Sequence, residues 1–269
     1  MTHRRTVCAG AATAAAVIAV LSAAVPAPSA AQDSVRVDTA PAVQRPDTAP
    51  PRALPVNGLL LSPQHLSYRM IVQFPDSEHV IGTREVDLQR STYSGFPAWL
   101  AVETRWGSVV TVDSLYMAYV NLRPLHWGST IGSARMALEF TPDSIYGATS
   151  GPTGSQNIVL GHGFDLLAGS AMSEIVLQLV PHTVGRTDSV SVLEVDLGSA
   201  RVLPGALSVV GEQDIDTPDG LVHCWVVSLS VGDSAVRYWV SESDPVVVRT
   251  RQDLPGQPGV AFEQRLISR

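Results

Sequence analysis

Apolar and polar residues alternate along most of the chain from Leu66 onward. In the first run, Leu66, Tyr68 and Met70 alternate with Ser67 and Arg69. Successive side chains of a β-strand point to opposite faces of the sheet, so this period of two predicts half-buried strands with one face in water. Further runs with this pattern are residues 86–88, 100–106, 134–140, 225–231, 236–240 and 246–250.

Turn residues separate these runs. Ser94-Gly95-Phe96-Pro97, Gly232-Asp233 and Asp244-Pro245 each stand between two of them, which predicts antiparallel pairing of neighbouring strands. The chain has room for roughly ten to twelve strands, and a sheet of that size must twist and curl. The predicted fold class is therefore mainly β: a strongly curved antiparallel sheet, as a half-barrel or open barrel.

One segment has a helical period instead. Between Phe164 and Val180 the apolar residues are three and four positions apart, and Ser170, Ser173 and Glu174 fall on the opposite stripe. This predicts one amphipathic helix, ended by Pro181 and packed on the concave side of the sheet. The Gly/Ser/Thr-rich stretch from 147 to 163 is predicted to be a loop beside it.

Sheet and helix could enclose an apolar pocket, which is the main binding hypothesis. All five tryptophans fall in predicted strands, where packing in the core is the alternative interpretation. The candidate ligand-binding residues are Phe164, Leu167, Ala171, Met172, Ile175, Trp225 and Trp239.

The N-terminal part of the chain differs from the rest. Arg4 and Arg5 precede an apolar run, and Ser29-Ala30-Ala31 follows it, which is typical of a signal peptide over residues 1–31. An uncleaved anchor is the alternative. Residues 32–57 are rich in Pro and Ala and are expected to be a disordered linker, and residues 58–269 a single antiparallel β domain. The protein is expected to be exported, to the periplasm or outside the cell, without a transmembrane segment in the mature chain.

The charge of the chain limits the classes of partner that it can bind. The chain has 25 acidic residues and 18 basic ones, all of them Arg, for a net charge of −7. No cluster of basic residues stands out along the sequence, which argues against nucleic acid and against anionic membranes. Cys224 is the only thiol outside the predicted signal peptide and is expected to be a buried structural residue.

Candidate catalytic chemistry is sparse. The seven histidines form no metal-binding spacing, and no serine stands in a nucleophile-elbow motif. Glu103 and Glu139 are expected on the solvent-exposed faces of strands, and Asp165 is expected to be a cap or a first-turn acid of the helix. The sequence therefore predicts no metal, no cofactor and no enzymatic activity.

The C-terminal part resembles a known family. A Pro-Asp-Gly turn at 218–220 leads into the strand with Cys224, followed by Arg237-Tyr238-Trp239-Val240 and by Pro245-Val246-Val247-Val248-Arg249. This run is similar to the exported bacterial family of domain of unknown function 3108, most clearly over residues 209–266. That family is similar in plan to periplasmic lipoprotein-carrier half-barrels, in which a curved sheet wraps helices and holds lipid chains. The resemblance implies an apolar ligand, although a single helix leaves room for a smaller cavity or none.

Three functions follow from these observations. The leading hypothesis is an exported, non-enzymatic β domain that binds a lipid or other hydrophobic molecule in the cell envelope. The alternative is a structural or protein-interaction module of the envelope. A hydrolase with dispersed carboxylates is the third and weakest hypothesis.

Overall fold

The computed structural model describes residues 54–152, 154–163, 165–196 and 199–269. The predicted signal peptide, nearly all of the predicted linker and the candidate residue Phe164 lie outside the described residues. The last residues of the predicted linker are part of the fold, because Leu54 and Val56 pack in the hydrophobic core.

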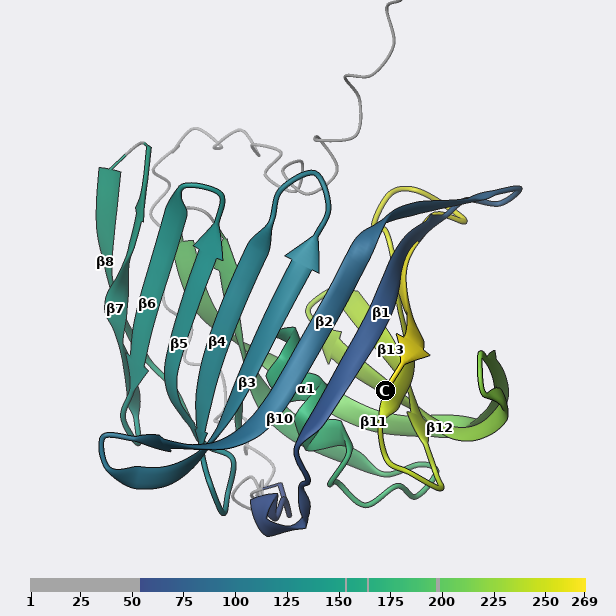
Figure 1. The fold of residues 1–269 in the computed structure, drawn as a ribbon, viewed down its shortest axis with the longest axis horizontal. Coiled ribbons are helices and arrows are strands. Elements are labelled where there is room, and N and C mark those ends of the chain that lie inside the picture. Colours follow the sequence, from purple (N-terminus) through teal and green to yellow (C-terminus); the bar gives the residue numbers. More distant parts are fainter. Residues whose placement is uncertain (1–53, 153, 164, 197–198) are drawn as a thin grey trace, which may run out of the picture. The chain divides into compact units, whose positions relative to one another are not determined.

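The described chain forms one sheet of 15 strands, one α-helix and one 3₁₀ turn (Figure 1). The strands are β1 (Gln64–Gln73), β2 (Glu78–Tyr93), β3 (Phe96–Trp106), β4 (Thr111–Ala118), β5 (Pro124–Ile131), β6 (Ala134–Phe140), β7 (Ser144–Gly151), β8 (Gly154–Gly161), β9 (Leu166–Ala168), β10 (Thr187–Asp196), β11 (Ser199–Thr217), β12 (Gly220–Val231), β13 (Ser234–Ser241), β14 (Val247–Asp253) and β15 (Ala261–Ser268). The 3₁₀ turn η1 spans Gly58–Leu60, and the helix α1 spans Gly169–Leu177.

The strand order runs from β8 down to β1, then through β15 down to β9. Every neighbouring pair is antiparallel except β9 and β10, which are parallel. The sheet curls so that β5 contacts β9 and β8 contacts β11, although the end strands β8 and β9 are not hydrogen-bonded to each other. Inside this curve lies α1, which touches β3, β9 and β10. The predicted fold class, a strongly curved sheet with one helix on its concave side, is confirmed, but the predicted number of ten to twelve strands is too low, partly because β8 and β9 lie in segments predicted as loop and helix.

Several predicted turns are also confirmed. Ser94 and Gly95 connect β2 to β3 with φ of 49° and 84°, so the tight turn uses the left-handed conformation that suits the twist of a hairpin. The predicted loop at 147–163 is wrong, since β7 and β8 form another hairpin there. Its small residues sit in a sheet because Gly147 lies against the carbonyl of Ala137, where a side chain would not fit.

The predicted helix is shorter than expected. Residues 166–168 form β9 beside β10, and α1 begins only at Gly169, whose φ of 77° turns the chain from strand into helix. Both segments are apolar because both are buried, so their composition fits one helix as well as a strand followed by a helix. The predicted cap is wrong: the helix starts without a side-chain cap, and Asp165 instead accepts a hydrogen bond from the Leu54 N–H.

The inward face of the sheet is apolar along most strands, as the alternation predicts. In β3 the predicted phase is wrong, because Trp99 and Ala101 are buried while Leu100 and Val102 are only half-buried. The five consecutive apolar residues 98–102 are compatible with either phase, and in the folded protein the phase that contains Trp99 faces the core. Cys224 is buried, as predicted.

Candidate functional site: an arginine-rich outer face

The interior of the sheet contains a buried ionic cluster centred on Arg84 of β2. Its Nη1 donates to the two carboxylate oxygens of Glu174 on α1 at 2.7 and 3.0 Å, and its Nη2 donates to Glu103 Oε2 on β3 at 3.0 Å. Gln264 on β15 accepts a further hydrogen bond at 2.8 Å. Arg84 is 0% exposed, and Tyr68 lies beneath it with the guanidinium carbon 5.1 Å from the ring centre. The cluster fixes the helix to three separate strands.

The position of Glu103 corrects the prediction that this carboxylate is solvated. Glu103 lies on the same inward face of β3 as Trp99 and Ala101, and it is 2% exposed. Glu139, the other carboxylate considered, lies on the outer face and is 54% exposed, as expected of a solvated acid. Glu103 and Glu174 are thus both buried and bonded to Arg84, unlike the exposed Glu139.

The two buried carboxylates have different proton affinities. Burial opposes ionisation of Glu103, but Arg84, Arg105 and Ser170 outweigh it and lower its pKa from 4.5 to about 2. Burial raises the pKa of Glu174, and the neighbouring charge of Glu103 raises it further, against the attraction of Arg84. Glu103 is paired with both Arg84 and Arg105, whereas Glu174 is paired with Arg84 alone, which explains why the two pKa values move in opposite directions.

This difference predicts how stability depends on pH. Folding depresses the pKa of Glu103, so its contribution to the free energy of unfolding is present above pH 4.5 and is lost as the pH falls from 4.5 to about 2. We expect Glu103→Gln to flatten this acid limb in urea unfolding measured between pH 2 and 6. The control is Glu139→Gln, and an equal slope in wild type and Glu103→Gln would contradict the expectation.

Most of the predicted ligand-binding residues lie together in the core. Leu167, Ala171, Met172 and Ile175 are 1–8% exposed and belong to one hydrophobic cluster. Trp225 is half-buried at the side of that cluster, where its ring stacks on His182 with the centroids 6.0 Å apart. The structure therefore gathers these five residues on the concave side. That they bind a ligand stays a prediction.

Trp239 is 5% exposed and belongs to the same hydrophobic cluster, but it lies on the other face of the sheet. Its neighbour Tyr238 is buried beside Glu174 and Ser173 of the helix, so Trp239 points to the other face of β13. There its Nε1 donates to Gln213 at 2.9 Å, and the guanidinium of Arg249 lies 4.9 Å from the ring centre. Trp239 thus belongs to the outer face, which carries the most distinctive polar group of the molecule.

Five arginines gather on this outer face, on four neighbouring strands. The alternation of side chains sets their direction, because Tyr68, Tyr238, Thr250 and Gln264 between them point inward. Cross-strand pairing then aligns them: β13 pairs with β14, β14 with β15, and β15 with β1. The five, which we call the arginine face, are Arg69, Arg237, Arg249, Arg251 and Arg265.

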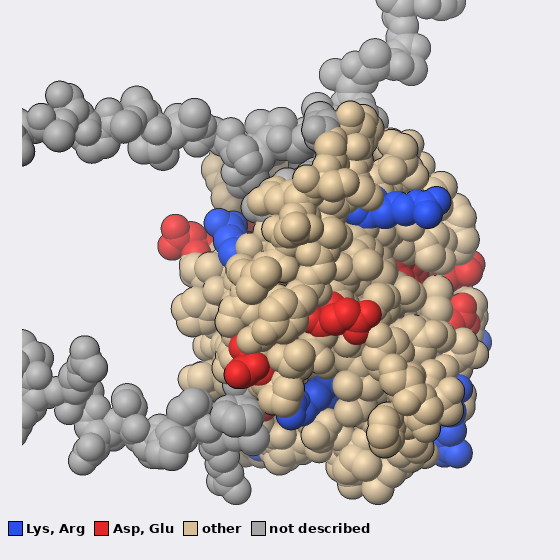
Figure 2. All heavy atoms as spheres, turned by 90° about the vertical axis from the view of Figure 1, so that its left-hand side faces the viewer, with Lys and Arg blue, Asp and Glu red and all other residues tan. Residues whose placement is uncertain are grey.

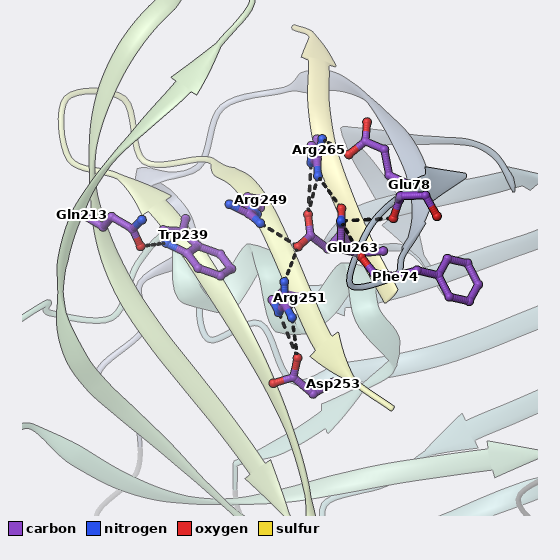
Figure 3. A network of polar contacts seen from close by, with 11 residues as sticks. Phe74, Glu78, Gln213, Trp239, Arg249, Arg251, Asp253, Glu263 and Arg265 are labelled. Atoms are coloured by element: carbon purple, nitrogen blue, oxygen red, sulfur yellow. Dashed lines mark hydrogen bonds and ion pairs between the residues drawn. The ribbon is translucent and has the colours of Figure 1, made fainter. Parts of the chain in front are cut away.

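Glu263 lies at the centre of the arginine face (Figure 3). Its carboxylate is 0% exposed and accepts hydrogen bonds from Arg249 at 2.6 Å, Arg251 at 2.9 Å and Arg265 at 2.9 Å. Burial opposes its ionisation, but the hydrogen bonds and charges of Arg249 and Arg265 outweigh burial and lower its pKa. One buried acid therefore holds three guanidinium groups in fixed positions.

The arginine face keeps an excess of positive charge. Arg251 also pairs with Asp253 and Arg265 with Glu78, each at 2.9 Å. Arg69 and Arg237 are exposed, and no carboxylate of the described chain forms an ion pair with either. Three acids are paired with three of the five arginines, so these eight residues carry two excess positive charges in a protein whose net charge is −7.

The sequence analysis missed this basic cluster because its members are far apart along the chain. Only Arg249 and Arg251 are close, at the two-residue spacing that puts both on one face of a strand. The other three are placed beside them by the pairing of β1 with β15 and β13 with β14. One end of the sheet differs: β7 and β8 contain no charged residue, and charged side chains are sparse on the side of the molecule in Figure 2.

A sequence model of a family described as "Protein of unknown function (DUF3108)" matches residues 67–260. The chain belongs to this family, as its C-terminal motifs indicated. It is thus a domain of unknown function with a barrel-like β fold. A search of the curated proteins finds no match to it.

Solved structures similar to this chain include the following two. One is a beta-barrel-like protein of domain of unknown function DUF1849 from Brucella abortus, with 8% identity and a TM-score of 0.47, covering 77% of this chain and 96% of that one. The other is the hypothetical lipoprotein YmcC from Escherichia coli K12, with 14% identity and a TM-score of 0.33, covering 81% of this chain and 89% of that one. Among the described residues, no helix has the length and hydropathy needed to cross a bilayer.

Proposed function

We propose that this protein is an exported, non-enzymatic interaction module of the cell envelope that binds an acidic segment of a partner protein on its arginine face. The observation that carries the proposal is the set of five arginines on four adjacent strands, of which three are held in place by the buried Glu263. The export and the absence of catalysis are inferred from the sequence.

A guanidinium offers a planar fork of donors that fits a carboxylate, and it is charged at every physiological pH. Arginines that are already fixed lose little side-chain entropy when they bind, which favours recognition by the arginine face over binding by free side chains. Side-chain exposures of 24%, 26% and 37% for Arg249, Arg251 and Arg265 leave part of each group open to a partner. An extended acidic segment could therefore contact several strands at once.

The interior favours the interaction module over the lipid carrier. The residues expected to line an apolar pocket are closely packed, and Leu167 and Ile175 are each 1% exposed. An acyl chain on the concave side would have to displace α1, which the ion pairs of Arg84 hold in place. Lipid binding remains the second candidate, and native mass spectrometry of gently purified protein would favour it by revealing a bound lipid.

The proposal is tested with a fluorescein-labelled oligoglutamate peptide. We expect wild type to bind it with an affinity that falls steeply with salt, and Arg69→Ser/Arg237→Ser to weaken binding by about tenfold, since two charges worth roughly 0.7 kcal/mol each are lost. These arginines are exposed and make no ion pair in the described chain, so the variant should fold normally.

The matched control is Arg90→Ser/Arg123→Ser, which removes the same charge from positions outside the arginine face and should bind like wild type. Equal binding by both double variants would overturn the proposal. A variant effect seen only with phosphatidylglycerol vesicles, and not with the peptide, would also overturn it and would indicate a membrane surface instead.

A further inference from the structure

A second surface feature lies on the outer face of β4–β7, on other strands than the arginine face. It is a shallow hollow of about 390 Å³. A cross-strand row of small residues forms its floor, because Ser114 pairs with Gly128, Gly128 with Ala137 and Ala137 with Ala148. The neighbouring row adds Thr130, Arg135 and Ser150 to its lining.

Polar atoms converge over Gly128. A Cβ atom on this residue would stand 2.9 Å from Ser114 Oγ and 3.5 Å from His126 Nε2. Glu139 fixes the histidine, since His126 Nδ1 lies 2.7 Å from its Oε1. With Nδ1 engaged in this way, Nε2 is the nitrogen that remains to exchange a hydrogen bond with a ligand.

Aromatic rings lie on the same face of the sheet, beside the hollow and outside its lining. Tyr93 stacks on His126 with ring centres 5.8 Å apart and lies 5.0 Å from the ring of Tyr116, and its hydroxyl donates to Glu139 at 2.6 Å. Tyr146 stands in the row of His126 and Glu139 and is 46% exposed. Rings held by their neighbours offer flat apolar area at little entropic cost.

The charge in the hollow is a single arginine. Arg135 is exposed, and no carboxylate of the described residues forms an ion pair with it. Thr130 and Ser150 are its cross-strand neighbours, Ser114 also lines the hollow, and each of these hydroxyl groups can both donate and accept a hydrogen bond. The hollow thus offers hydroxyl groups and one cation in an open shape that a chain can cross, with imidazole and phenol rings beside it.

We infer that this hollow binds a short oligosaccharide that carries a carboxylate, such as a uronic acid oligomer. Sugar rings present flat C–H faces to aromatic rings and hydroxyls to Ser, Thr and His side chains, and the carboxylate matches Arg135. An acidic peptide is the less suitable occupant, because one cation among hydroxyls offers it little charge. The inference stands apart from the proposed function, since it uses other residues and another ligand.

Gly128 allows a direct test. Its φ is not positive and a Cβ atom added to it would meet only side-chain atoms, so Gly128→Val should fill the hollow once the Ser114 hydroxyl rotates away. We expect tetragalacturonate to bind wild type in calorimetric titration and Gly128→Val to weaken it at least tenfold. Arg135→Ser should weaken tetragalacturonate about tenfold while leaving the weaker binding of neutral cellotetraose unchanged.

The control Ala235→Val adds a valine side chain at an exposed strand position elsewhere and should bind like wild type. Absence of binding to wild type, or equal binding by Gly128→Val, would overturn the inference. Arg69→Ser/Arg237→Ser should retain sugar binding, so failure of the arginine-face proposal would leave this result unaffected. Stronger binding of oligoglutamate than of tetragalacturonate in the hollow would also overturn it.

Discussion

Arg84→Met is expected to lower the free energy of unfolding by about 3–5 kcal/mol, the usual cost of removing one partner from a buried ion pair. The variant leaves Glu103 and Glu174 buried without their shared guanidinium, 2% and 4% exposed. Methionine fills similar volume, so the loss comes from uncompensated charge rather than from a cavity. Urea unfolding followed by tryptophan fluorescence measures it.

The triple variant Arg84→Met/Glu103→Leu/Glu174→Leu separates charge from packing. Replacing a whole buried ionic cluster by apolar residues of similar size is often neutral or stabilising. We expect it to recover most of the stability lost by Arg84→Met, with Arg105 still paired to Asp113. If the triple variant is less stable than Arg84→Met, the cluster is not the charge-balanced unit described above.

The period-two pattern was sufficient to predict the sheet, its curvature and most of the hairpins. It also places Arg84 correctly, because Arg84 is two residues before the buried Val86. An arginine is usually exposed to solvent, so its residue type alone would place Arg84 on the outer face. Only the contacts of Arg84 with α1 show that its charge is paired in the interior. Glu103 was mispredicted for a different reason. The apolar residues 98–102 do not show which alternate positions of β3 face the core, and the direction of Glu103 depends on that choice.

In the helix region, hydrophobic periodicity cannot distinguish the possible secondary structures. A buried three-residue strand followed by a buried helix has nearly the same composition as one longer helix, and the parallel pairing of β9 with β10 depends on residues more than twenty positions away. Ser173 and Glu174 were assigned to a wet stripe, yet both are buried, because the curled sheet surrounds the helix on more than one side.

The arginine face could not be predicted from local sequence. Arg69 and Arg265 are nearly two hundred positions apart and become cross-strand partners only because β1 pairs with β15. The same is true of the hollow, whose four small residues come from four strands. The alternation of apolar and polar residues predicts which face of the sheet each side chain lies on. Strand order and register determine which side chains become neighbours.

Glu263→Gln is expected to change stability and binding in opposite directions. Glutamine keeps the shape but removes the charge that three arginines share, and hydrogen bonds to charged groups are worth about 1.5–3 kcal/mol, so the free energy of unfolding should fall by about that amount. The excess charge of the arginine face would rise by one. Binding of the oligoglutamate peptide should therefore become about threefold to fivefold tighter at low salt, which corresponds to less than 1 kcal/mol.

Asp253→Asn provides the matched control, because it removes an acid that pairs with Arg251 but is 61% exposed. It should raise peptide affinity by a similar or smaller factor and leave the stability nearly unchanged, since exposed pairs contribute little to folding. Weaker peptide binding by Glu263→Gln in a folded protein would mean that the acid acts mainly by fixing the guanidinium groups. In that case preorganisation outweighs net charge, and Arg249→Lys, which keeps the charge but loses the planar fork, should weaken binding in the same way.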